Sequence, residues 1–153
     1  MPTVRENILA NIKTTLEGIT IANGYNNTIA SVQRWDKRGN ALRQVPCLVV
    51  NAGQEEKQMS PNPNFTCRLS VYIDLWIRQD EADAQATDTV LSGILGDIEK
   101  ALMVNNTRGG YAIDTSIKSN VPFETVEGQP HAGLTIELEI LYQHKQSDPS
   151  VAG

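Results

Sequence analysis

The sequence predicts an α+β domain with the element order α-β-β-β-α-β-β, in which a mostly antiparallel or mixed sheet carries two helices packed on one face. Residues 65–78 alternate apolar and polar side chains without a break, the period of a strand with one buried face. Residues 4–18 and 81–104 repeat their apolar side chains at the helical period instead. Turn-rich connections between the predicted strands favour antiparallel pairing. We expect residues 1–145 to form a single domain.

The first predicted element is a helix over residues 4–18. Thr3 and Glu6 form a capping box at its start, in which Thr3 caps the helix and Glu6 reaches back. Gly18 gives the chain a place to stop. The apolar stripe of this helix follows at near-helical spacing: Ile8, Ile12, Leu16 and Ile19.

Two short strands and a long loop are predicted next. Residues 28–35 are rich in β-prone side chains, and residues 45–51 form a short apolar run. Pro46 cannot donate to a sheet ladder, so it belongs at a strand start or on an edge. Residues 52–64, with two prolines, predict a loop of the length that is often functional.

The alternating strand over residues 65–78 is long for a domain of this size. At about 3.3 Å per residue it extends for ~46 Å. A compact chain of 153 residues has a radius of gyration of about 15 Å and hence a diameter of roughly 40 Å. We therefore expect this strand to bend, or its end to project beyond its own core.

The remaining elements are a long helix, two strands and a polar end. Asp80 is placed to cap the helix over 81–104, in which Gly93 and Gly96 allow a close approach to the sheet. A fourth strand is expected over 111–117, followed by a second loop over 119–132. The last strand alternates from residue 134 to residue 143. Residues 146–153 predict a flexible C-terminal tail.

Composition limits the classes of function. The chain has 13 basic against 18 acidic residues, a net charge of −5, whereas a protein that grips nucleic acid by its phosphates needs a basic face. An acidic wall past which DNA slides is still allowed, because it repels phosphates. No apolar run is long enough for a signal peptide or a membrane span. Cys47 and Cys67 are interpreted as small buried hydrophobes, with a cross-strand disulfide as the alternative.

No motif for catalysis or metal binding is present in the sequence. His131 and His144 have no acidic or cysteine partner at a ligand spacing, so we expect no metal and no cofactor. Glu137 and Glu139 project from one side of a strand, where a solvated acidic strip is the simpler interpretation than acid–base catalysis. The sequence therefore predicts a protein that is not an enzyme.

The even-numbered face of residues 65–78 mixes aromatic and charged side chains. Trp, Tyr and Arg are enriched at protein–protein interfaces, so this face is a candidate subunit contact, with Trp76 packed on another subunit. The alternative is a solvated face with cross-strand ion pairs, such as Arg68 with Glu137 or Glu139. The two long loops are the second candidate for partner contacts. The candidate interface residues are Arg68, Tyr72, Asp74, Trp76 and Arg78 on the strand and Glu55, Glu56, Lys57, Glu124 and Glu127 in the loops.

Several segments together resemble one protein family. Leu42-Arg43-Gln44-Val45-Pro46 leads into a short apolar strand and Gly53-Gln54-Glu55, and the long strand ends in Ile73-Asp74-Leu75-Trp76-Ile77. The long helix carries Ile98-Glu99-Lys100-Ala101-Leu102-Met103, and Ile136-Glu137-Leu138-Glu139-Ile140-Leu141-Tyr142 closes the domain. Over residues 3–144 this pattern resembles the tail terminator proteins of long-tailed bacteriophages.

The resemblance implies a homohexameric ring that caps the tail tube, stops its polymerisation and offers a docking surface to the head connector. Its partners would be further copies of itself, the tail tube protein and a head-closure or connector protein, with DNA passing through the lumen without specific binding. It implies assembly in the host cytoplasm and a place in the neck of the virion tail. Two alternatives stay open: another neck component, such as a head-closure or adaptor protein, and a small cytosolic enzyme or ligand-binding domain.

Overall fold

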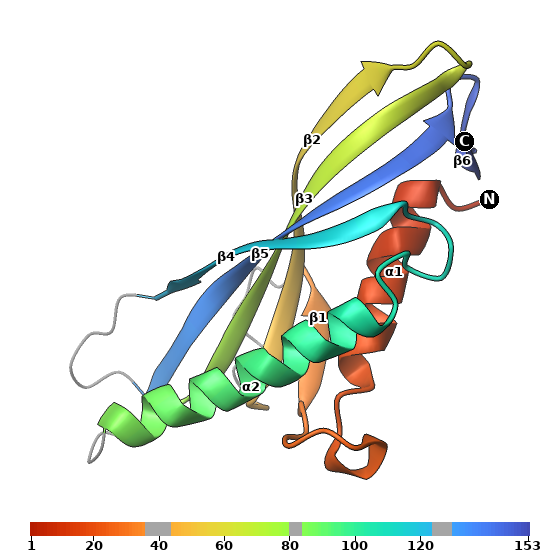
Figure 1. Cartoon of the computed structure of the whole chain (residues 1–153). Helices are drawn as coiled ribbons and strands as arrows, with labels where there is room; N and C mark the ends of the chain where they lie inside the picture. Colours follow the sequence, from red (N-terminus) through yellow and green to blue (C-terminus); the bar gives the residue numbers. More distant parts are fainter. Residues whose placement is uncertain (36–43, 80–83, 124–129) are drawn as a thin grey trace.

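A computed structural model describes residues 1–35, 44–79, 84–123 and 130–153 of the chain (Figure 1). The described residues form two α-helices, one short 3-10 helix and a curled, mixed six-stranded sheet, which confirms the α+β class. The elements in chain order are α1 (Val4–Glu17), η1 (Ile21–Asn23), β1 (Ser31–Arg34), β2 (Cys47–Met59), β3 (Asn64–Arg78), α2 (Ala84–Val104), β4 (Asp114–Pro122), β5 (His131–Lys145) and β6 (Asp148–Ala152).

The sheet is built around β3, the strand that the alternating pattern predicts. Its strand order is β1-β2-β3-β5-β4, and β6 pairs with the outer end of β5. β3 pairs antiparallel with β5 over its whole length, from Asn64 opposite Lys145 to Arg78 opposite His131. β1 and β2 form the parallel pair, whereas the other pairings of the described strands are antiparallel. The structure therefore confirms the long strand and the mixed sheet.

The core lies against the odd-numbered side chains of β3. Every second residue from Cys67 to Ile77 is at most 3% exposed, so the predicted alternation is realised in burial. Both helices contribute apolar side chains to the same core cluster, and each such buried side chain contributes about 1.5–3 kcal/mol. These are Ile8, Ile12 and Leu16 from α1 and Ile94, Ile98 and Leu102 from α2.

The N-terminus of α1 is capped as predicted, but by one hydrogen bond rather than a reciprocal pair. The backbone N–H of Glu6 donates to Thr3 Oγ1 at 3.0 Å. The Glu6 carboxylate pairs with Arg34 Nη1 on β1, 2.6 Å away. The side chain that the capping box assigns to the helix end therefore joins α1 to the edge of the sheet.

The prediction of a loop over residues 52–64 is wrong. β2 continues to Met59, and a register shift between Ala52 and Glu55 is the only interruption in its pairing with β3. The long β3 supplies hydrogen-bonding partners as far as Met59 opposite Phe65, so the polar residues of β2 gain more as a strand than as a loop. Glu55, Glu56 and Lys57 consequently lie on a strand rather than on a loop.

The bounds of β4 and the structure of the C-terminal segment also differ from the prediction. β4 occupies Asp114–Pro122 instead of 111–117, which shortens the second predicted loop. Glu124 and Glu127, and the predicted cap Asp80, lie outside the described residues. The flexible tail predicted over 146–153 is wrong, because β6 pairs with β5 at His144 and Lys145 and lies against α1. The sequence did not predict β6 because this segment is largely polar and contains Pro149.

The sheet both bends and projects, the two outcomes expected of so long a strand. Figure 1 shows β2 and β3 curling along their length, with their outer ends extending beyond the N-terminal end of α1. We call this outer part of β2 and β3, residues 54–70, the hairpin end. Cys67 and Leu69 of the hairpin end still belong to the apolar core cluster, and β5 pairs with β3 along this segment, so the hairpin end is held by apolar side chains, by β5 and by a few polar contacts.

Candidate functional site

The hairpin end has two faces because the register shift in β2 resets the alternation of its side chains. Glu55 lies opposite Leu69 and Lys57 lies opposite Cys67, on the face that continues the core. Glu56 lies opposite Arg68 on the other face. Since partners that lie directly opposite share a face of the sheet, each face receives its own set of charged residues.

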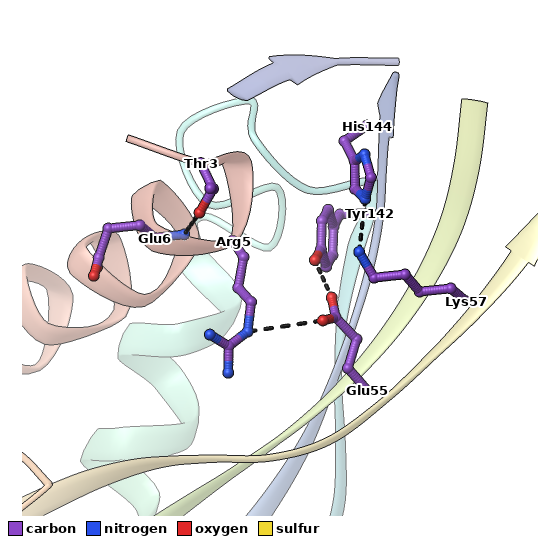
Figure 2. Close-up of polar contacts among 7 residues, drawn as sticks. All are labelled: Thr3, Arg5, Glu6, Glu55, Lys57, Tyr142 and His144. Atoms are coloured by element: carbon purple, nitrogen blue, oxygen red, sulfur yellow. Dashed lines mark hydrogen bonds and ion pairs between the residues drawn. The ribbon is translucent and has the colours of Figure 1, made fainter. Parts of the chain in front are cut away.

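On the core-side face, Glu55 joins α1 to β5 (Figure 2). The Tyr142 hydroxyl donates a hydrogen bond to the Glu55 carboxylate, and Arg5 Nε lies 3.8 Å from its other oxygen. Burial, followed by the hydrogen bond to Glu55, raises the pKa of the Tyr142 phenol. The phenol is therefore a hydrogen-bond donor throughout the physiological pH range.

Lys57 and His144 form the second polar contact of this face. Lys57 Nζ lies 2.8 Å from His144 Nε2, and His144 Nδ1 lies 2.8 Å from the backbone oxygen of Lys145. A carbonyl oxygen only accepts, so Nδ1 carries the ring hydrogen and Nε2 accepts from the Lys57 ammonium. The Glu55–Tyr142 and Lys57–His144 contacts therefore both connect β2 with β5 (Figure 2).

These groups are too enclosed to act on a substrate. Tyr142 is 1% and His144 is 4% exposed, and Cys67 beside them is fully buried. Burial raises the pKa of the Cys67 thiol, which keeps it in its unreactive protonated form. We therefore interpret the cluster as the structural support of the hairpin end.

The opposite face of the hairpin end is open. A groove of about 490 Å³ is lined by Glu56, Lys57, Gln58, Thr66 and Arg68. The Arg68 side chain is 57% exposed and its Nη1 lies 2.9 Å from Glu139 Oε1. The cross-strand ion pair predicted from the sequence is thus confirmed, with Glu139 as the partner of Arg68. The groove exposes both acidic and basic side chains. It therefore suits the polar surface of another protein better than it suits a free anion or cation.

The other candidate residues of β3 follow on the same face, away from the hairpin end. Tyr72 is half-buried and its ring lies over Gly53. Asp74 accepts a hydrogen bond from Thr135 at 2.7 Å, so it belongs to an internal polar contact. Arg78 is exposed at the far end of the strand.

Trp76, the candidate for a subunit contact, packs within its own chain. Its ring stacks on Phe123 with the centroids 4.4 Å apart, and it covers buried Cys47 and Val49. The hypothesis that Trp76 also contacts another subunit stays a prediction, but a small second core on this face already accounts for its presence.

The sequence found only part of this site. It brought together Glu56, Lys57 and Arg68 as candidates from separate segments, and the structure places these three in one groove. It missed Arg5, Tyr142 and His144. The available signal was the parity of β5, because Tyr142 and His144 continue the inward-facing positions of that strand.

Both cysteines are free thiols. Cys47 lies opposite Trp76, which is nine residues (76 − 67) along β3 from Cys67, a separation of roughly 30 Å at 3.3 Å per residue. The alternative of a disulfide between them is therefore wrong. Among the residues that the structure describes, no three His, Cys, Asp or Glu side chains are grouped to hold a metal ion. No helix in the described ranges is long and apolar enough to cross a membrane.

A scan against protein-family models and a search of curated proteins found no match for this chain.

Proposed function

We propose that this protein is a phage tail terminator, a ring-forming structural protein that caps the tail tube, stops its polymerisation and offers a docking surface to the head connector. The observation that carries this proposal is the hairpin end, which extends beyond the helices and presents a polar groove rather than an enclosed pocket (Figure 1). A strand pair that reaches beyond the helices and keeps an open edge offers backbone and polar side chains to a neighbour.

Open strand edges support assembly into a ring. β1 pairs with β2 only from Cys47 to Val50, so within the described ranges Asn51–Met59 has a strand on one side only. β4, at the other side of the sheet, pairs only with β5 among the described strands. Two different edges that meet head to tail generate a closed ring or a filament. Each of these two edge strands contains a register shift and a lysine, Lys57 in β2 and Lys118 in β4. These features disfavour pairing of the edges with unrelated strands.

We also infer that both helices cover the odd-numbered face of β3, which leaves the face of Arg68 to partners. The shared core cluster of α1, α2 and the odd-numbered residues of β3 supports this arrangement. Following the resemblance of the sequence to tail terminators, we propose that the ring is a homohexamer in the neck of the virion tail, assembled in the host cytoplasm. Its partners are the tail tube protein and a head-closure or connector protein. It has no catalytic activity, and its acidic balance suits a lumen through which DNA passes without specific binding.

The test is whether the protein stops the growth of tail tubes. Purified protein is added to polymerising tube subunits, and tube lengths are measured by electron microscopy. We expect tubes with a ring at one end that do not elongate when more subunits are added. Arg68→Glu should weaken this capping by roughly tenfold or more, since it reverses one charge in the groove.

Lys13→Glu is the matched control because it reverses the charge of a partly exposed residue on α1, outside the hairpin end and its groove. We expect it to cap tubes as the wild type does. Unrestricted tube growth in the presence of folded wild-type protein would rule out a terminator. Binding to the portal side of the neck instead of to the tube would identify a head-closure or adaptor protein.

A further inference from the structure

A second groove lies on the core-side face, beside the point where β1 ends. It has a volume of about 270 Å³ and is lined by Arg5, Leu9, Arg34, Trp35, Val50 and Ala52. α1 supplies one wall, the end of β1 supplies the other, and β2 forms the floor. We call it the edge groove. It is separate from the groove at the hairpin end, with which it shares no lining residue.

The edge groove combines an apolar wall with an arginine rim. Leu9 and Val50 line the groove but are almost fully buried, so its exposed apolar surface is mainly that of Trp35. Trp35, 60% exposed, forms a large apolar wall and adopts a φ of 58°, a region that side chains of its size rarely occupy. Strained backbone of this kind is concentrated at binding sites.

The rim arginines have donors to spare. Arg34 Nη1 is held by Glu6, but a guanidinium has five N–H donors. Arg5 Nε is buried and makes no hydrogen bond, because its nearest acceptor on Glu55 is 3.8 Å away. A buried donor without an acceptor destabilises the folded chain. The rim therefore favours a partner that brings an oxygen acceptor together with an apolar group.

The same chain exposes a surface with the complementary composition. Met103 and Val104 end α2 and are 45% and 75% exposed. Tyr111 and Ile113, just before β4, are 42% and 50% exposed. The half-buried carboxylate of Asp114 follows immediately and accepts one hydrogen bond from Asn106. We call these five residues the α2–β4 patch. All five lie within residues 103–114, around the connection from α2 to β4, and exposed apolar side chains that gather on a surface commonly mark a contact site.

We propose that the α2–β4 patch of one copy docks into the edge groove of a second copy, with Ile113 against Trp35 and Asp114 facing Arg5 and Arg34. This inference rests on the proposed ring and names one contact between its subunits. The groove and the patch are different surfaces of one chain. Their contact is therefore head-to-tail, and it continues from copy to copy until a ring closes.

Mixing two variants tests the direction of this contact. Trp35→Ala removes a wall of the groove and leaves the patch intact, whereas Ile113→Glu blocks the patch and leaves the groove intact. Both residues are at least half exposed, so both variants should fold. Each variant alone should self-associate roughly tenfold or more weakly than the wild type in analytical ultracentrifugation. The mixture should form 1:1 dimers and nothing larger, because one intact groove meets one intact patch.

Ile21→Glu is the matched control, since Ile21 is 65% exposed on η1 and belongs to neither surface. It should assemble as the wild type does. A photoreactive phenylalanine at position 35 gives a second readout, with intermolecular cross-links expected to residues 111–114. Single variants that assemble normally, a mixture without dimers, or the absence of these cross-links would overturn the docking. In those cases a wild type that still caps tubes would keep the proposed function, whereas a wild type that does not would remove it.

Discussion

At the scale of single residues, the hairpin end depends on polar contacts between strands. Glu55 points to the core side of β2, where its side chain is 16% exposed and an unpaired charge would be unfavourable, whereas Lys57 reaches His144 from an exposed position. Tyr142 and His144 on β5 supply the partners, and Arg5 adds a guanidinium from α1. The polar sequence of β2 is therefore compatible with a strand because β5 carries two polar residues at the matching inward positions.

Tyr142→Phe should reveal the contribution of the first pair. The substitution removes the donor to Glu55, whose side chain is only 16% exposed, and should lower the free energy of unfolding by about 1–3 kcal/mol in urea titrations. Tyr111→Phe, at an exposed tyrosine, should change it by less than about 0.5 kcal/mol. Equal stability of the two variants would show that the buried hydroxyl contributes nothing.

The same tyrosine gives an expectation at alkaline pH. Burial and Glu55 raise the pKa of Tyr142 in the folded chain, so the folded state keeps a proton that the unfolded state releases near its ordinary 10.0. This contribution to stability is complete below pH 10 and is lost as pH rises above it. In absorbance titrations, wild type and Tyr142→Phe should release the same number of tyrosine protons until the wild type unfolds. An extra proton released by folded wild type would contradict this expectation.

Glu6 should contribute in the acidic range. The hydrogen bond from Arg34 lowers the pKa of Glu6 below its ordinary 4.5, so the folded state binds this proton later than the unfolded state does. The stabilisation is present above about pH 4.5 and is lost as pH falls through the lowered value. Both side chains are partly exposed, so Glu6→Gln should cost about 0.2–1 kcal/mol at pH 7 and almost nothing at pH 2. A cost that does not depend on pH would mean that the ion pair is not its origin.

At the scale of elements, the ring of Tyr72 on β3 leaves no room for a side chain at position 53 of β2. A Cβ there would lie 2.5 Å from Tyr72 Cε2 and 3.2 Å from the backbone oxygen of Ser70. Gly53→Ala should therefore destabilise the protein by about 1–3 kcal/mol, measured by urea unfolding. Gly96→Ala is the control, because its added Cβ would meet nothing within 4 Å inside α2. It should stabilise the helix by up to about 1 kcal/mol.

The elements also show what a sequence pattern can and cannot predict. β3 was predictable because a single buried face imposes a strict period of two on its side chains. The outer half of β2 was not, because its inward residues are Glu55 and Lys57, and the register shift after Ala52 breaks the period. Their hydrogen-bonding partners on this face are Tyr142 and His144, 87 residues further along the chain. A local pattern contains no information about partners at that distance.

The candidate site was likewise predictable only in part. Arg68 and its acidic partner could be predicted, since a cross-strand pair needs only the two alternating strands to be neighbours. The groove beside Arg68 could not, because it exists only where Glu56 continues a strand that the polar sequence concealed.

At the scale of the whole molecule, the net negative charge of the chain opposes its binding to DNA. A net charge of −5 gives the folded chain no excess of cations with which to displace the counterions of a duplex. The cations of the two grooves are already opposed: Arg68 pairs with Glu139 and Arg34 pairs with Glu6. We therefore expect no shift of double-stranded DNA in gel mobility assays at about 0.1 M salt, even at protein concentrations near 10⁻⁴ M, where non-specific binders are retained. A double variant, Glu139→Gln with Glu6→Gln, frees both arginines and should raise any residual binding at low salt. A wild type that retains DNA at 0.1 M salt would contradict a lumen that lets DNA pass, whatever the protein does to tail tubes.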